Sequence, residues 1–338
     1  MSRRTLTLLL SSVLAAGLLL GALVGQVPYV ALGPGPTFNT LGVSDDKPVI
    51  DVQGREVFPA DGHLDLTTVG VRSSLSLGEA LVGWLRRDEA VVPRELVFPP
   101  DQSDEEVDAE NAREMTQSQD AATTAALGQL GIPVSVVVGE VQPGSPAAGA
   151  LRTGDVLTRV DDVPVTSPGQ LRTLVSDRAV GTPVSLGYRR DGADASATLT
   201  TAASPDDPPR SVVGVATTVT YPFTVTIALK DVGGPSAGLM FALGIVDKLE
   251  PGSLTGGAYI AGTGEITPEG VVRPIGGIQQ KLRGAREKGA TVFLVPAENC
   301  PDAAASRPDG LGLAKVSTLD EAVRALEVLR GGGTPAAC

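Results

Sequence analysis

An uninterrupted apolar run close to the N-terminus is the feature that most constrains what this chain can form. Residues 5–24 carry no charge, and a helix that rises about 1.5 Å per residue would carry them across roughly 30 Å of hydrocarbon. Arg3 and Arg4 precede the run, and positive residues stay on the cytoplasmic side of a membrane. We therefore expect residues 1–32 to hold a single-pass anchor in the plasma membrane, with a cytoplasmic N-terminus and an extracytoplasmic remainder.

A cleaved signal peptide is the alternative interpretation of this run. Signal peptides usually have an apolar core of ~7–15 residues followed by a small-x-small cleavage site. Residues 22–26 contain no convincing site of that kind. The sequence favours the uncleaved anchor, and N-terminal sequencing of the mature protein would distinguish the two.

The composition excludes several classes of function. The 338 residues carry a formal net charge of −12, so no basic surface is expected to bind nucleic acid. His63 is the one histidine and no HExxH motif occurs, so we predict no metal site. The absence of a GxxxxGK[ST] loop argues against a nucleotide-dependent module, and we predict no cofactor.

The two cysteines, Cys300 and Cys338, can remain oxidised outside the cytoplasm. A disulfide between them would hold the glycine-rich tail, residues 331–338, which has little apolar surface to order itself. Two free thiols are the alternative. We therefore treat this pair as a disulfide candidate.

Hydrophobic periodicity predicts strands and helices in the first third of the chain. Ser103 and Glu106 form a capping box, and the helix they open runs toward Leu130. Because this helix is mostly polar and alanine-rich, we expect it to lie along a surface. The other expected elements are an extended juxtamembrane segment at 27–42, strands at 48–57 and 63–71, and a helix at 76–85.

Residues 127–203 form a compact β-rich unit. They contain Gly144-Ser-Pro-Ala-Ala148, Leu151-Arg-Thr-Gly-Asp-Val-Leu157 and Val160-Asp-Asp-Val-Pro-Val165, and on these motifs the unit resembles a bacterial protease-associated PDZ domain. The resemblance implies capture of an extended peptide added as a strand. It also places a carboxylate-binding loop near Leu130, Gly131 and Ile132. A purely architectural role for this unit is the alternative.

A glycine- and proline-rich turn, residues 231–239, leads into an apolar helix expected from Ala237 to Leu249. It delivers Ser236 onto the first turn of that helix, where free backbone N–H groups and the helix dipole can stabilise an oxyanion. A simple helix cap is the alternative. The Gly-x-Ser-x-Gly pattern of hydrolases also fits, but it requires a later histidine. His63 lies upstream, which disfavours a Ser-His-Asp triad.

A lysine can replace the missing histidine as the base. Ile278, Lys281 and Leu282 share one face of a predicted helix by their i, i+3, i+4 spacing. Burial on an apolar face lowers the pKa of a lysine, so that the neutral amine can accept a proton. The alternative is that Lys281 extends its ammonium group to solvent.

Three motifs in order, residues 233–238, 260–266 and 274–281, closely resemble the Lon protease domain. They read Gly-Gly-Pro-Ser-Ala-Gly, Ile-Ala-Gly-Thr-Gly-Glu-Ile and Pro-Ile-Gly-Gly-Ile-Gln-Gln-Lys. The resemblance implies Ser236 as nucleophile and Lys281 as general base. It further implies that Thr263 hydrogen-bonds the lysine, and that backbone amides around Ser236, including those of Gly233 and Gly234, bind the oxyanion.

These observations predict an α+β fold with a Lon-type protease domain, a PDZ domain and one N-terminal transmembrane helix. We expect residues 33–126 to hold the juxtamembrane segment and the first part of a split protease domain, 204–330 its catalytic part, and 331–338 a tail. The predicted function is ATP-independent serine endopeptidase activity on extracytoplasmic or membrane-associated proteins and peptides. A non-catalytic or self-processing PDZ scaffold is the alternative. Lon-type domains commonly form rings, so a homo-oligomer is compatible with the sequence.

Overall fold

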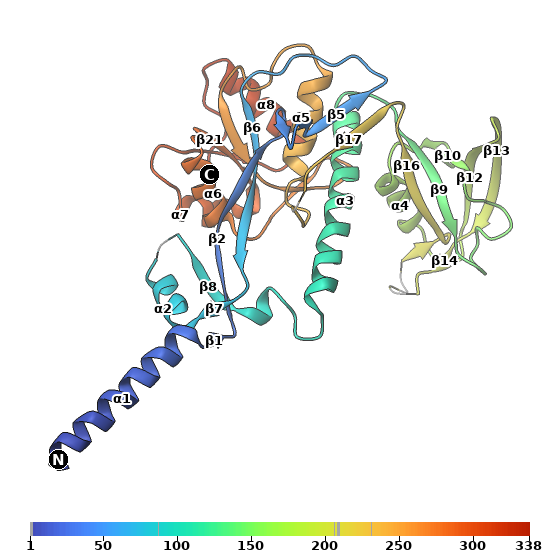
Figure 1. Ribbon diagram of the computed structural model, residues 1–338. Helices are drawn as coiled ribbons and strands as arrows, with labels where there is room; N and C mark the ends of the chain where they lie inside the picture. The colour runs from blue at the N-terminus through green and yellow to red at the C-terminus, as the bar shows by residue number, and fades with distance from the viewer. Residues whose placement is uncertain (1–2, 87, 206, 208–209, 231) are drawn as a thin grey trace.

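Two separate β-sheets organise the residues that follow a protruding N-terminal helix (Figure 1). The computed structural model describes residues 3–86, 88–205, 207, 210–230 and 232–338. Asp231, the first residue of the glycine- and proline-rich turn, lies outside the described residues, as do residues 1 and 2 of the expected anchor. The mixture of helices and strands confirms the expected α+β class.

The N-terminal helix α1 (Arg3–Val24) extends away from the rest of the molecule, as Figure 1 shows. Its residues 3–21 are long and apolar enough to cross a membrane, with a mean hydropathy of 1.7 and no burial against the protein. Length and composition alone do not distinguish a membrane helix from a signal sequence near an N-terminus.

The larger body is built on a six-stranded sheet with strand order β22-β21-β18-β6-β2-β8. Neighbouring strands from β22 to β6 run parallel, whereas β2 and β8 are antiparallel additions. The strands are β2 (Tyr29–Asn39), β6 (His63–Arg72), β8 (Ala90–Pro93), β18 (Tyr259–Gly262), β21 (Val292–Pro296) and β22 (Gly312–Val316). This sheet therefore joins residues 29–93 with residues 259–316.

Strand β2 departs from the extended juxtamembrane segment expected at 27–42. It is extended, but it lies between β6 and β8 in the sheet, and Val30 and Ala31 are buried. Its prolines are tolerated because the β2–β6 register shifts between Pro34 and Thr37, where a bulge interrupts the ladder.

Helices cover both faces of this sheet, and alternation along the strands supplies both cores. In β21, Phe293 and Val295 point to one face and Leu294 to the other. The first face packs on α6 (Ile278–Glu287) and α7 (Cys300–Ala305), and the second on α5 (Gly238–Leu249), α8 (Leu319–Arg330) and α3 (Asp104–Gln129).

Helix α3 corrects the expectation of a surface helix. The capping box between Ser103 and Glu106 is present, but residues 122–127 are buried in the main core. Their small side chains let α3 pack closely on α5. The sequence of this helix is alanine-rich and only weakly amphipathic, so it gave no indication that the helix is buried through small residues.

Short elements complete the larger body. A capping box between Ser76 and Glu79 begins α2. The remaining elements are α2 (Leu77–Leu85), the 3₁₀ turns at Arg94–Leu96 and Ala297–Asn299, and the strand pairs β1 (Gln26–Val27) with β7 (Leu75–Ser76), β3 (Val43–Ser44) with β4 (Lys47–Pro48), β5 (Ile50–Gln53) with β17 (Thr224–Ile227), and β19 (Glu265–Ile266) with β20 (Val272–Arg273).

The second sheet lies beyond α3 in Figure 1 and forms its own core. Its main path is β13-β12-β10-β9-β16, with β11 paired to β10. The elements are β9 (Ser135–Val141), β10 (Val156–Val160), β11 (Val163–Pro164), α4 (Pro168–Ser176), β12 (Pro183–Arg190), β13 (Ala193–Thr200) and β16 (Val215–Thr220), with the pair β14 (Ala202–Ala203) and β15 (Ser211–Val212) beside it. Because β16 pairs with β9, this sheet continues past residue 203, the boundary expected from the sequence.

An ion pair between the buried Asp155 and the half-buried Arg190 lies at the edge of this second core. Arg190 donates to both carboxylate oxygens of Asp155, at 2.7 Å each. The guanidinium holds the pKa of Asp155 below its ordinary value. Asp155 is the acidic residue of the Arg-Thr-Gly-Asp motif. The turn that contains this motif is therefore held by an ion pair as well as by its backbone conformation.

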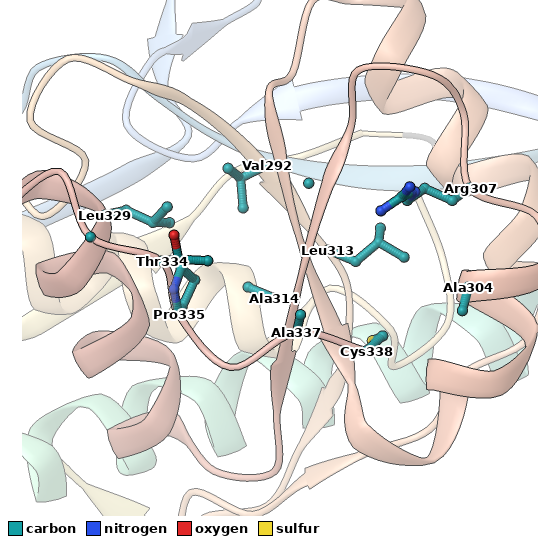
Figure 2. A pocket seen from close by; sticks show the side chains of 12 residues that line it. Val292, Ala304, Arg307, Leu313, Ala314, Leu329, Thr334, Pro335, Ala337 and Cys338 are labelled. Carbon is teal, nitrogen blue, oxygen red and sulfur yellow. The ribbon is translucent and has the colours of Figure 1, made fainter.

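The C-terminal tail is fixed to the larger body. Cys300 and Cys338 form a disulfide, and the Lys315 amide donates to the Ala336 carbonyl at 2.8 Å along the outer edge of β22. A cavity of about 530 Å³ lies under the tail. Figure 2 shows its largely aliphatic lining, including Leu313 and Leu329. Arg307 and Thr334 are the polar side chains of this lining.

Candidate active site

Ser236 lies in the loop between β17 and α5. Gly234, with φ +81°, turns the chain there, and a side chain at that conformation would be strained. The N-cap residue of α5 is Ala237, so Ser236 precedes the helix instead of occupying its first turn as expected. The orientation of its half-buried side chain is therefore set by the loop conformation and not by regular helix geometry.

Lys281 reaches the same place from α6. Gly277 begins this helix in the left-handed conformation, with φ +70°, and the Lys281 amide donates to its carbonyl at 3.1 Å. The Lys281 side chain is only 3 % exposed, so it does not extend its ammonium group into solvent. Burial lowers the pKa of Lys281 to about 7, because a low-dielectric site disfavours the charged form.

A short hydrogen-bond network joins these residues to Thr263. Lys281 Nζ lies 2.7 Å from Ser236 Oγ and 2.9 Å from Thr263 Oγ1. The Thr263 hydroxyl donates to the Ser236 carbonyl at 3.0 Å, and the Gly264 amide donates to the same oxygen at 2.8 Å. The structure thus brings together Ser236, Lys281 and Thr263, the three residues for which the sequence analysis predicts catalytic and supporting roles.

Helix α3 holds the serine loop from behind. The Gly234 amide donates to the Asn111 carbonyl at 3.0 Å, and the Ser118 hydroxyl donates to the Pro235 carbonyl at 2.9 Å. A Cβ on Gly233 would lie 2.8 Å from Asn111 Cβ, so glycine is needed for this approach. Sequence reasoning missed Asn111 and Ser118, and no local signal marks them: Ser118 is the only serine of α3, but it stands between two glutamines in a polar stretch.

The backbone amides near Ser236 differ in their availability. The Gly234 amide is already engaged by Asn111, so it is not free to bind an oxyanion. Within the described part of the chain, the Gly233 and Ser236 amides make no hydrogen bond. The Ala237 amide is likewise without a hydrogen bond among the described residues, so Gly233, Ser236 and Ala237 carry the unengaged amides near the serine hydroxyl.

A groove of about 560 Å³ opens beside the network. One wall is β6 from Thr67 to Val71, and the other is the loop from Val232 to Ala237. Strand β18 pairs with β6 only as far as Leu66, so the edge of β6 from Thr67 onward faces the groove. An extended chain of peptide dimensions would find backbone partners along such an edge.

The second sheet has a groove of its own. About 450 Å³ lies between α4 and the edge strand β16, with Gly214 at one end. None of the three residues expected to form a carboxylate-binding loop lines it. Leu130 ends α3, Gly131 turns the chain with φ +65°, and Ile132 is buried in the core of the larger body. Gly131 and Ile132 line a different cavity of about 770 Å³, which also borders Ser167 and Gln170 at the start of α4. The carboxylate-binding role expected from the resemblance stays a prediction.

Comparisons with known proteins define the class of this molecule. A model of the PDZ domain matches residues 107–201, and a model of the Lon protease (S16) C-terminal proteolytic domain matches residues 227–327. The fold therefore joins a PDZ domain to a proteolytic domain of serine-protease type.

The particular relatives are Lon proteases. Lon protease 1 of Sorangium cellulosum is 42% identical over 93 residues, which are 27% of this chain and 11% of that protein. Lon protease 2 of Bacillus subtilis is 36% identical over 90 residues, 27% of this chain and 16% of that protein. Both resemblances confirm the expected family, and the chain spans only about a tenth to a sixth of the length of these relatives.

Among solved structures, the PDZ domain of the SdrC-like protein from Listeria innocua is 25% identical. The match covers 25% of this chain and 92% of that one, with a TM-score of 0.23.

Proposed function

We propose that this chain is an ATP-independent serine endopeptidase with Ser236 as nucleophile and Lys281 as general base. The observation that carries the proposal is the 2.7 Å separation of Lys281 Nζ and Ser236 Oγ, made by a lysine that is 3 % exposed. A buried amine with a pKa of about 7 is neutral in a large fraction of molecules at physiological pH, which an exposed lysine is not.

The reaction follows from this geometry. Neutral Lys281 takes the proton of the Ser236 hydroxyl as Oγ attacks the carbonyl carbon of the scissile bond. The unengaged amides of Gly233, Ser236 and Ala237 supply the donors for the oxyanion that forms. The Lys281 ammonium then returns the proton to the departing amine, leaving an acyl group on Ser236 Oγ. Water, deprotonated by Lys281, releases the second product and restores the serine.

Thr263 is a positioning residue in this scheme. It accepts a hydrogen bond from Lys281 Nζ and donates one to the Ser236 carbonyl. These contacts fix the amine and the serine loop relative to each other. A fixed pair is preorganised for proton transfer and needs little rearrangement when the bond to carbon forms.

The substrates are flexible or unfolded polypeptide segments outside the cytoplasm or at the membrane. The open edge of β6 supports their binding as an added strand beside Ser236, and the groove between α4 and β16 supports a second peptide site in the PDZ domain. Helix α1 supports anchoring in the plasma membrane, and the Cys300–Cys338 disulfide suits an oxidising compartment.

The test is hydrolysis of an unfolded, fluorescently quenched protein by the full chain without nucleotide. Wild type should cleave it, while Ser236→Ala and Lys281→Ala should each lose at least about 10³-fold in kcat/KM. Glu287→Ala, at an exposed position of α6, is the matched control and should remain active. Activity in either variant of the pair would refute the dyad. Inert wild type that still binds peptide would favour a scaffold, and cleavage of its own chain alone would favour self-processing.

A further inference from the structure

Large apolar side chains gather on the surface next to the N-terminal helix. Among the described residues outside α1, the exposed leucines and tryptophan all lie between residues 77 and 96. Leu85 is 86 % exposed, Leu96 is 72 % exposed and Trp84 is 51 % exposed. The other members are Leu77 and Leu81, joined by Val82. Such a contiguous patch is unusual on a surface that faces only water.

Helix α2 has its polarity reversed relative to a helix of a soluble protein. Its buried residues are the small Ala80 and Gly83, while its long aliphatic side chains point outward. A Cβ on Gly83 would lie 2.5 Å from Val91 Cγ2, so the helix lies directly on β8. The capping box holds the helix in place, so the outward direction of these side chains is built into the fold.

Hydrogen bonds fix the patch at the end of α1. The Leu77 amide donates to the carbonyl of Gly25, one residue after α1, at 3.3 Å. The Arg94 amide, at the start of the turn that carries Leu96, donates to the Pro28 carbonyl at 3.0 Å. Strand β1 also pairs with β7, placing Val27 opposite Leu75. Figure 1 shows α2 at the end of α1, on the side of the body away from the PDZ domain.

We propose that α2 and Leu96 form an interfacial membrane contact, with the outward face of α2 lying in the boundary between lipid headgroups and acyl chains. This rests on the proposed membrane anchoring by α1. If α1 crosses the bilayer, the membrane surface passes close to Gly25, and the nine residues of α2 extend only about 13 Å from that point.

The chemistry of the patch fits a lipid surface. Its outward positions, residues 77, 81, 82 and 85, are aliphatic. Trp84 donates its indole N–H to the Val91 carbonyl at 3.3 Å and packs edge-on against Tyr29 with ring centroids 5.5 Å apart. Aromatic residues with one satisfied polar group concentrate at the membrane interface. Two attachment points, α1 and α2, would fix the orientation of the body above the membrane.

Trp84 reports on this contact directly because it is the only tryptophan in the chain. The full chain is reconstituted in phosphatidylcholine–phosphatidylglycerol vesicles with or without bromine on the acyl chains, and flotation of the same sample measures anchoring. We expect bromine to remove on the order of half of the Trp84 emission, because bromine quenches indole at short range and the proposed interface lies within the depth of the acyl chains.

The other outcomes overturn the proposal in distinguishable ways. Protein that floats but whose Trp84 is quenched only by aqueous acrylamide has α2 in water, although α1 is anchored. Protection from both quenchers means that a second copy covers α2. Protein that does not float with the vesicles is not membrane-anchored, and this result would refute both the proposed anchor and the proposed α2 contact. None of these results bears on the Ser236–Lys281 chemistry, which soluble-substrate hydrolysis reports.

Variants test the functional consequence. Leu81→Asp with Leu85→Asp should reduce the bromine quenching severalfold and the cleavage of a vesicle-tethered substrate about fivefold, with soluble-substrate cleavage unchanged, since burying two carboxylates in the interface is costly. Val163→Asp with Val180→Asp, exposed positions of the PDZ domain, is the matched control and should change neither. Full quenching in the α2 variant would show that another segment contacts the lipid.

Discussion

In the proposed mechanism, the protonation state of Lys281 sets the working pH of the site. Because burial lowers the pKa of Lys281 to about 7, the amine is protonated and unable to act as a base below that pH. We predict that kcat/KM falls about tenfold per pH unit below pH 7 and reaches a plateau above about pH 8. A series of initial rates from pH 5 to 9 measures this. A profile that stays flat to pH 5 would contradict Lys281 as the base.

The same burial opposes folding. The pKa of Lys281 is about 7 in the folded state and 10.5 as its ordinary value, so between these pH values the unfolded chain binds the extra proton. The cost to stability is therefore full below pH 7 and disappears as pH rises toward 10.5. We predict that Lys281→Met raises the free energy of unfolding at pH 7 by on the order of 2 kcal/mol while abolishing hydrolysis.

Urea unfolding of Lys281→Met and wild type at pH 7 and pH 10 checks this prediction. The difference should shrink at the higher pH. An equal difference at both would show that packing, and not the buried charge, sets the stability of this site.

Thr263 contributes through its hydroxyl. Thr263→Val keeps the shape but removes the partner of Lys281 Nζ and of the Ser236 carbonyl. We expect kcat to fall at least about tenfold, the effect of one net hydrogen bond of roughly 1.4 kcal/mol, with KM little changed. Thr263→Ser should restore most of the rate. If Thr263→Val shows wild-type kcat, its hydroxyl has no positioning role.

At the scale of elements, α3 acts as a support for the serine loop. Ser118 donates to the Pro235 carbonyl, and its own side chain is buried. Ser118→Ala should lower kcat about three- to tenfold through loss of loop order, with unchanged peptide binding to the PDZ groove. Thr116→Ala, on the exposed side of α3, is the control. A normal rate for Ser118→Ala would show that its contact with the serine loop does not contribute to catalysis.

The regular elements of this chain were accessible from its sequence wherever periodicity or capping was strong. The capping boxes at Ser76 and Ser103 mark the starts of α2 and α3 correctly. The strand expected at 63–71 is β6. The burial of α3 was not accessible, because small residues carry almost no hydrophobic periodicity. The place of β2 within the sheet was not accessible either. Prolines usually indicate that a strand is interrupted, and the bulge that accommodates them here is not visible in the sequence.

The residues of the candidate site were likewise predictable where the signal is local in sequence, and not predictable where it is not. Ser236, Thr263 and Lys281 stand in motifs that are local in sequence, and their convergence follows from the short segments between them. Asn111 and Ser118 act through contacts with residues more than a hundred positions away, which no local pattern shows. The role of Leu130–Ile132 rests on resemblance alone. These residues follow the end of α3 and do not line the groove between α4 and β16, and their binding role stays a prediction.

For the molecule as a whole, the tail disulfide closes the end of the chain onto its body. Cys300 and Cys338 are separated by 38 positions, for which chain entropy gives about 4 kcal/mol of stabilisation. We predict that Cys300→Ser with Cys338→Ser lowers the thermal midpoint by several degrees and leaves peptide hydrolysis at 25 °C unchanged. Calorimetry with and without reductant measures this, and reductant should have no effect on the double variant. An unchanged midpoint would show that the tail adds nothing to stability.

The position of the tail also bears on the open side of the larger sheet. Strand β22 stands at the end of the strand order, and residues 336 and 337 lie along it. An uncovered edge strand offers unpaired backbone groups to other chains. The Cys300–Cys338 disulfide holds the segment that covers this edge, so reduction of one bond would leave a strand edge open to pairing between neighbouring copies.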